Sequence, residues 1–264
     1  MEENKYLIDY YSQGIEDERL TSRVGLVEFQ TTMRYIEKYL KPGDRVIEIG
    51  AGTGRYSHAL AKQGYAVDAV ELIENNIKIF NDKTQPGENV TIKQGNALDL
   101  STFTNETYDI VLLLGPMYHL YTENDKKTAL SEAIRIAKKG ATIIVAYVIS
   151  DACVVLDGFV TKSWDIFEFI EKGMVDSETF KTHSKPEDLF ELVRKDDIDN
   201  IMNDFTVTRL HYVATNGITG FISGAVEKMD EAMFELYLKY HYSVCEREDM
   251  VGVTHHSLDI FKKE

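Results

Sequence analysis

The feature that most constrains this chain is a regular alternation of short apolar segments with helical segments between residues 45 and 149. Segments that are apolar along their whole length are typical of parallel strands buried on both faces. The alternation therefore predicts a doubly wound α/β domain, whose ligands bind outside the carboxyl ends of the strands. The expected strands are 45–49, 65–71, 90–94, 108–114 and 141–149, and the expected helices are 54–63, 73–82 and 124–138.

The flanking segments predict a lid, a cap and two further strands. Residues 1–44 are expected to form a helical lid that ends at Lys41-Pro42-Gly43-Asp44, because proline cannot continue a helix. Residues 45–264 are expected to form the α/β domain, with a mostly parallel seven-stranded sheet and helices on both faces. The expected elements after residue 150 are strands at 205–214 and 253–261, and helical cap insertions at about 155–200, with a helix at 186–195, and at 225–246.

The charge limits the partners. The chain of 264 residues has 29 Lys and Arg against 44 Asp and Glu, a formal net charge of −15. An acidic surface repels phosphate backbones, so a nucleic-acid substrate is disfavoured. No apolar run approaches the roughly 18 residues that a membrane span needs, and the first residues contain no apolar signal core. A cytoplasmic protein without membrane partners is expected.

The cysteines and histidines give no sign of a metal site. Cys153 and Cys245 are far apart and have no CxxC spacing, which suits a reducing compartment. His255 and His256 are neighbours on an expected strand, so their side chains point to opposite faces. No metal is expected.

A glycine-rich turn joins the first expected strand to its helix. Gly50, Gly52 and Gly54 let the backbone turn sharply and let a ligand approach closely, next to the unpaired N–H groups of a helix start. The dinucleotide fingerprint G-x-G-x-x-G is not met, because Arg55 occupies its last position. A P-loop is excluded, since no Gly-Lys-Ser/Thr follows.

Two further strand ends carry polar side chains. Glu71 ends the second expected strand, 21 positions after Gly50. At that distance a carboxylate can accept hydrogen bonds from both ribose hydroxyls of an adenosine; alternatively, Glu71 is a surface residue at a strand end. Asn96 follows the third strand, where it either meets an adenine edge or belongs to a plain turn.

Together, the pattern Glu48-x-Gly50-x-Gly52-x-Gly54, Glu71, Gly95-Asn96-Ala97 and the apolar strand entering Leu114-Gly115-Pro116 resembles the class I S-adenosylmethionine-dependent methyltransferase family over about residues 40–150. The resemblance implies an antiparallel last strand and S-adenosylmethionine as cofactor. One departure is Asn96, where many members carry aspartate; asparagine keeps an acceptor oxygen and adds a donor. The implied contacts are Gly50, Gly52 and Gly54 at the methionyl part, Glu71 at the ribose, and Asn96 with Ala97 at the adenine. The other residues expected at the cofactor are Glu48, Ala51, Leu72, Leu98, Leu114, Tyr11 and Thr32.

The acceptor is expected beside the segment Leu114–Tyr121, which leaves the fourth strand. This segment lacks the Asn/Asp-Pro-Pro-aromatic motif associated with planar amides and exocyclic nitrogens. His119 is the candidate general base, because imidazole titrates near neutrality, and Tyr118 is the candidate to orient the acceptor or line the methyl pocket. Alternatively, His119 caps a helix or is hydrogen-bonded in a loop.

The leading functional hypothesis is methylation of a small molecule at O, N or C by in-line displacement. A protein methyltransferase and a non-catalytic S-adenosylmethionine-binding regulatory protein remain alternatives, and Arg55 disfavours an NAD-dependent oxidoreductase. The expected cap helices form either an acceptor cap or a dimer interface, so both a monomer and a homodimer fit the sequence.

Overall fold

The computed structural model describes residues 3–11 and 20–264. Its centre is a sheet of eight strands, of which β8 runs antiparallel to both neighbours while the other pairs are parallel. The doubly wound sheet and the antiparallel last strand are thus confirmed. The order across the sheet is β3 (Val90–Gln94), β2 (Ala66–Glu71), β1 (Arg45–Ile49), β4 (Tyr108–Leu113), β5 (Ala137–Ile149), β8 (His256–Lys263) and β7 (Val207–Ala214), with β6 (Leu192–Val193) paired to the end of β5.

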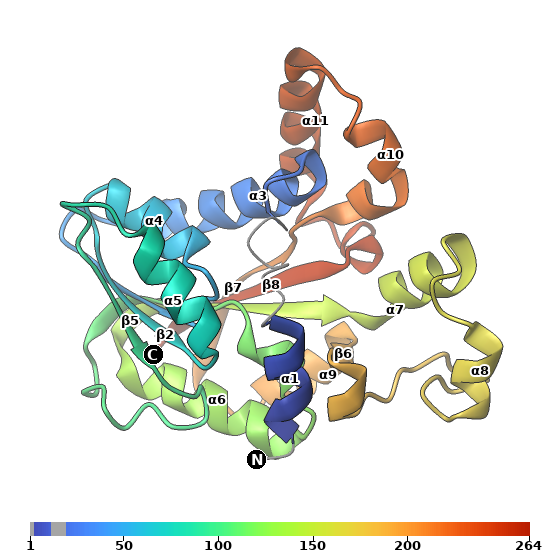
Figure 1. The fold of residues 1–264 in the computed structure, drawn as a ribbon, viewed down its shortest axis with the longest axis horizontal. Coiled ribbons are helices and arrows are strands. Elements are labelled where there is room, and N and C mark those ends of the chain that lie inside the picture. Colours follow the sequence, from blue (N-terminus) through green and yellow to red (C-terminus); the bar gives the residue numbers. More distant parts are fainter. Residues whose placement is uncertain (1–2, 12–19) are drawn as a thin grey trace.

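Helices cover both faces of this sheet (Figure 1). One face carries α3 (Arg23–Tyr39), α4 (Arg55–Lys62) and α5 (Glu74–Lys83), and the other carries α6 (Glu123–Ile136) and α9 (Lys195–Met202). The strands are apolar along their length because both of their faces are buried; in β1, Val46 and Ile47 point to opposite helix layers and neither is exposed.

The expected lid consists of two different parts. The helix α1 (Glu3–Tyr11) lies at the carboxyl ends of the strands, where Leu7 and Tyr11 line a cavity. In contrast, α3 packs its buried face on the sheet. Its N-cap is Ser22, whose side chain accepts a hydrogen bond from the backbone N–H of Gly25. Residues 12–19 of the expected lid lie outside the described residues.

The cap is less helical than the sequence predicts. The helix expected at 186–195 is wrong: Pro186 begins only the 3₁₀ turn η3 (Pro186–Asp188), because Leu189 takes a positive φ of 69° that ends it. Residues 192–193 then extend as β6. The helical elements that follow β5 are α7 (Ser150–Cys153), the π-helix η2 (Val154–Val160) and α8 (Ile166–Glu171), and α7 and α8 project beyond the end of β5 (Figure 1).

The single helix expected at 225–246 is also wrong. The chain forms α10 (Ser223–Val226) and α11 (Glu231–Val244), because Asp230 caps the second helix by accepting from the backbone N–H of Met233. The remaining short elements are the 3₁₀ helices η1 (Pro116–His119), η4 (Gly217–Ile222) and η5 (Val251–Val253). None of the described helices combines the length and the apolar character needed to cross a bilayer.

Candidate functional site

A cavity of about 390 Å³ lies at the carboxyl ends of β1, β2, β3 and β4, which is the position that a doubly wound sheet offers to ligands. Its size is within the range of small-molecule sites. We call it the main cavity. It brings together these residues proposed from the sequence: Tyr11, Gly50, Gly52, Glu71, Leu72, Asn96, Ala97, Leu98, Tyr118 and His119.

The glycine turn needs glycine for different reasons at different positions. Gly52 has a φ of +54°, and a Cβ added there would meet nothing within 4 Å, so its missing side chain leaves space on the cavity side. Gly50 also has a positive φ, and a Cβ there would lie 2.5 Å from Pro116 Cδ. Gly50 therefore lets the segment after β4 pack against the turn. Gly54 lies outside the lining and makes room for the ring of Phe80.

Glu71 holds the glycine turn and the start of α5 together. One carboxylate oxygen, Oε2, accepts from the backbone N–H of Gly52 at 2.8 Å, and Oε1 accepts from that of Ile73 at 2.8 Å. Burial raises the pKa of Glu71, and these hydrogen bonds oppose the rise. A carboxylate offers about four lone-pair sites, so Glu71 keeps acceptor capacity toward the cavity that it lines.

Asn76 is a site residue that the sequence reasoning missed. Its side chain is buried, lines the main cavity and places Nδ2 3.4 Å from Glu71 Oε1. Its Oδ1 is buried and has no partner among the described residues. A buried amide oxygen without a partner is costly, and a ligand hydroxyl donated to it would remove that cost. In the sequence, the feature that could have indicated this role is the pair of polar residues Asn75 and Asn76 at the start of a helix.

The turn after β3 forms the adenine side of the expected site. Asn96 Oδ1 accepts from the backbone N–H of Leu98 at 3.0 Å, so the acceptor oxygen is already engaged in an Asx turn. The amide nitrogen of Asn96 and the second lone pair of its oxygen are left to meet a ligand. Ala97 and Leu98 line the same wall of the cavity.

Glu48 lies outside the lining of the main cavity, although it was expected at the cofactor. Its carboxylate accepts from the hydroxyl of Ser57 and, at 2.9 Å, from the backbone N–H of the same residue. Burial raises the pKa of Glu48 to about 8, and the bonds from Ser57 oppose that rise. Since Gly54 at the N-cap of α4 has no side chain, Glu48 supplies the acceptor that the first turn of this helix lacks.

Three other expected contacts are also outside the lining, because their side chains point into the helix layers. Ala51 packs with Ala69 and Phe80, Leu114 belongs to the core beneath α3 and α4, and Thr32 is buried within α3. The resemblance placed these residues near the site without fixing the direction of their side chains.

His119 is held at both ring nitrogens. Nδ1 lies 2.8 Å from the carbonyl oxygen of Leu189, and Nε2 lies 2.9 Å from the hydroxyl of Tyr11. A carbonyl can only accept, so Nδ1 carries the proton and Nε2 of the neutral ring accepts from Tyr11. Burial lowers the pKa of His119 to about 4, so the ring is neutral near pH 7. Tyr118 lines the cavity beside it and donates its hydroxyl to the carbonyl of Leu114 at 2.8 Å.

The carbonyl that orients His119 comes from a strained turn. Leu189 has φ 69° and ψ −43°, and the N–H of Phe190 donates to the carbonyl of Asp188 at 2.9 Å. This is a γ-turn of the rare, positive-φ kind, which costs about 1–3 kcal/mol in backbone strain. The Leu189 carbonyl also accepts from the hydroxyl of Tyr121 at 2.8 Å. The residue with the strained backbone is therefore the one whose carbonyl anchors His119.

A second cavity of about 280 Å³ adjoins the main one, since Ser184 lines both. Its walls include Trp164, Phe169 and Phe190, and Phe190 also packs against the ring of His119 with centroids 5.4 Å apart. An aromatic compartment thus lies next to the proposed base.

A doubly wound sheet with an open glycine turn and a carboxylate ending the second strand defines a domain that binds a nucleoside. Residues 47–145 match the family model of the methyltransferase domain. This match supports the class I S-adenosylmethionine-dependent methyltransferase family for residues 47–145, and the expected resemblance is confirmed.

Curated relatives agree with this assignment. The chain is 30% identical over 151 residues to the ribosomal protein L11 methyltransferase of Listeria monocytogenes, a match that covers 54% of this chain and 44% of the relative. It is 26% identical over 130 residues to the demethylmenaquinone methyltransferase of Lysinibacillus sphaericus, which covers 46% of this chain and 53% of the relative. The chain thus spans about half the length of these relatives.

Among solved structures, the fold is similar to that of magnesium protoporphyrin IX methyltransferase from Synechocystis, crystallised with S-adenosylhomocysteine. The TM-score is 0.60, and the match covers 99% of this chain and 100% of the other at 14% identity. At that identity the similarity shows the fold alone.

Proposed function

We propose that this chain transfers a methyl group from S-adenosylmethionine to a small-molecule acceptor. The observation that carries the proposal is the main cavity, where the open side of Gly52 and the pair formed by Glu71 and Asn76 face the same space. A bend without side chains beside two oxygen acceptors suits a sugar with two hydroxyl groups and an extended amino-acid chain.

The donor is held mainly by strand ends. Gly52 is proposed to admit its methionyl part, Glu71 and Asn76 to accept from the ribose hydroxyls, and Asn96 with Ala97 and Leu98 to contact the adenine. When bound, the cofactor supplies an activated methyl group on a positively charged sulfur. The chain contributes alignment, which can lower the barrier by about 7–11 kcal/mol.

His119 is the proposed proton acceptor. A neutral imidazole with a pKa of about 4 is a weak base, so it takes a proton from an acceptor only as the attack makes that acceptor strongly acidic. The proton goes to Nε2, whose bond to the Tyr11 hydroxyl is released at the same time. Proton transfer at this stage suits an acceptor amine or hydroxyl that loses its proton during or after formation of its bond to the methyl carbon.

The acceptor is proposed to occupy the second cavity. Trp164, Phe169 and Phe190 favour a molecule with an apolar or aromatic body, and the second cavity lies beside the main cavity because Ser184 lines both. The net charge of −15 argues against a nucleic-acid acceptor. The helix α1 is proposed as the movable lid, since Tyr11 reaches across the cavity to His119.

Titration calorimetry with S-adenosylhomocysteine and with NAD tests the donor assignment on the wild-type chain. Binding of S-adenosylhomocysteine and not NAD is expected, and binding of NAD alone would overturn the proposal. Incubation with S-adenosylmethionine and a fractionated metabolite extract then tests catalysis by the release of S-adenosylhomocysteine. If S-adenosylhomocysteine were released only with protein fractions, the acceptor would be a protein and not a small molecule. If the chain bound the cofactor but released no S-adenosylhomocysteine with any fraction, it would be a regulatory protein.

A further inference from the structure

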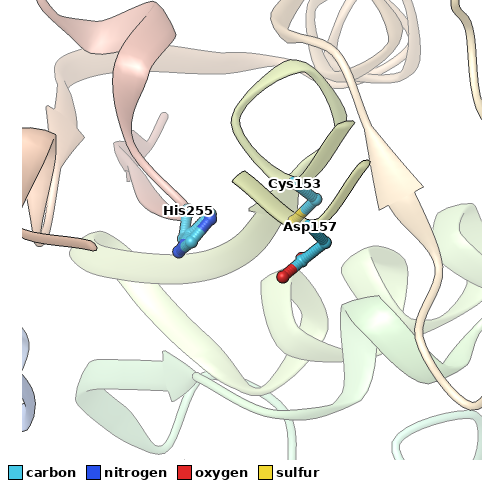
Figure 2. A group of neighbouring side chains, drawn as sticks. All are labelled: Cys153, Asp157 and His255. Carbon is cyan, nitrogen blue, oxygen red and sulfur yellow. The ribbon is translucent and has the colours of Figure 1, made fainter. Parts of the chain in front are cut away.

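A second group of reactive side chains lies outside the main cavity. Cys153 Sγ, a carboxylate oxygen of Asp157 and a ring nitrogen of His255 all lie within 4.8 Å of one another. Figure 2 shows the three side chains: Cys153 and Asp157 come from one helical segment, and His255 approaches from the chain just before β8. Within residues 3–11 and 20–264, this is the one place where at least three such donors come so close.

The helical segment that carries two of the donors has an unusual geometry. Residues four apart share a face of a helix, which brings Cys153 and Asp157 together. The segment changes from α to π after Cys153, and the N–H of Thr161 donates to the carbonyl of Leu156 five residues earlier at 2.7 Å. Single π turns inside helices occur frequently at functional sites.

The third donor is held in place from several sides. The backbone N–H of His255 donates to Asn216 Oδ1 at 3.1 Å, and its carbonyl accepts from the N–H of Ile149 at 2.7 Å. The ring makes a backbone hydrogen bond with Ala152, and a Cβ at Gly220 would lie only 3.0 Å from Nδ1. His255 Nε2 is buried and has no hydrogen-bond partner among the described residues. The His255 ring thus has one nitrogen without a hydrogen-bond partner and lies close to a thiol and a carboxylate.

We propose that Cys153, Asp157 and His255 bind a Zn²⁺ ion. Sulfur, imidazole nitrogen and carboxylate oxygen are the three donor types that zinc takes in proteins, and the mixture is too soft for Mg²⁺ or Ca²⁺. Ligands on one tetrahedral zinc lie roughly 3.5 Å apart, so the donors close in by about 1 Å, within reach of side-chain torsions. The bond to Ala152 supplies the outer contact that orients a metal-bound histidine.

The proposed site has an open fourth position. Cys153 and Asp157 also line the second cavity, so the remaining coordination position faces that space. Three protein ligands with one open position are typical of zinc sites that bind water or a substrate group. The inference depends on the geometry of this cluster and not on the proposed methyl transfer.

Two measurements test the proposal. The first is the zinc content after dialysis against a weak chelator, and the second is the zinc affinity measured in competition with a chromogenic chelator. About one ion per chain is expected. Cys153→Ser, Asp157→Asn and His255→Asn are each expected to weaken binding by more than the roughly 10–100-fold that loss of an outer contact causes. His183→Asn is the matched control, because His183 lines the same cavity and lies outside the cluster. Equal zinc binding by wild type and all three variants would overturn the site.

Cobalt provides a third measurement that does not require the ligand variants to fold. The protein loaded with Co²⁺ is expected to show a thiolate-to-cobalt charge-transfer absorption band. The only other cysteine is Cys245, which is buried next to Tyr35, so Cys245→Ser is expected to keep the band. Absence of the band in wild type, or its loss in Cys245→Ser, contradicts the proposal. Neither result bears on the binding of S-adenosylhomocysteine, so the two proposals fail separately.

Discussion

The two sides of the main cavity are built in different ways. The proposed donor side consists mainly of backbone and side chains at the ends of the three neighbouring strands β1, β2 and β3, all between Ile49 and Leu98. The acceptor side consists of side chains from distant segments, since His119 contacts Tyr11 across 108 positions and Leu189 across 70. Backbone at the ends of a sheet is fixed by the sheet itself, whereas the acceptor side depends on the packing of a helix and a strained turn. The donor side is therefore expected to control binding, and the acceptor side to control turnover.

The largest effect is expected at His119. The variant His119→Ala is expected to lower kcat by about 10²–10⁴-fold, the usual contribution of a general base, while the Kd for S-adenosylhomocysteine changes little. Steady-state kinetics and calorimetry on the same preparation check this separation. If His119→Ala lost cofactor affinity and turnover to the same extent, the division between the two sides would be wrong.

The lowered pKa of His119 also predicts how the reaction rate depends on pH. Because burial lowers the pKa of His119 to about 4, the reactive neutral form is complete above about pH 5 and is lost as the pH falls through 4. The wild-type rate is therefore expected to stay flat from pH 5.5 to 7.5 if no other group limits it. The lowered pKa also contributes folding stability that is present above the unfolded value of about 6.5 and is lost as the pH falls toward 4. A rate that rises tenfold per unit through pH 6.5 would show that His119 titrates normally.

The donor side can be tested with a matched pair of glycines. Gly52 and Gly87 both have positive φ, at 54° and 93°, and both have open space where a Cβ would stand, but only Gly52 lines the main cavity. Gly52→Val is expected to weaken S-adenosylhomocysteine binding by about 100-fold, whereas Gly87→Val adds comparable backbone strain without filling the site. Calorimetry measures the affinity and thermal unfolding measures the strain. Equal affinities in the two variants would place the ligand away from the glycine turn.

A smaller effect is expected at the carboxylate beside that turn. Glu71→Gln keeps the size of the side chain but gives up a charged acceptor, and hydrogen bonds to charged groups contribute about 1.5–3 kcal/mol. The expected loss is about 10–100-fold in cofactor affinity, because Glu71 holds both Gly52 and the proposed ribose. Asn76→Ala removes a neutral acceptor and a long hydrogen bond to Glu71, and it is expected to cost about 10-fold or less in cofactor affinity. A larger loss from Asn76→Ala than from Glu71→Gln would reverse their proposed roles.

The same contrast explains what the sequence could predict. Gly50 and Gly52 follow β1 and Glu71 ends β2, so periodicity and spacing place them at the same edge of the sheet. The contacts of His119 could not be predicted, because they require knowing that α1 and the turn at Leu189 meet there. The resemblance implied that Glu48 contacts the cofactor, whereas its carboxylate binds Ser57 at the start of α4. Alternation within a fully buried strand does not indicate which helix layer a side chain faces. The donors Cys153 and His255 are about a hundred positions apart and carry no spacing signal.

The smallest effect is expected at the strained turn, where the anchor is a backbone carbonyl and not a side chain. Leu189→Gly removes the cost of a positive φ but also loses a half-buried side chain, so the two effects largely cancel and the free energy of unfolding is expected to change by about 1 kcal/mol or less. Since the carbonyl remains available to His119 Nδ1, kcat is expected to stay within about threefold of wild type. Leu189→Pro is the informative partner variant: proline fixes φ near −65°, which is incompatible with this turn and moves the carbonyl away from His119. A lower kcat in Leu189→Pro with unchanged cofactor affinity would identify the turn as a positioning element of the acceptor side. If Leu189→Gly lowered kcat as far as Leu189→Pro does, the side chain of Leu189, and not the geometry of its carbonyl, would be what holds His119.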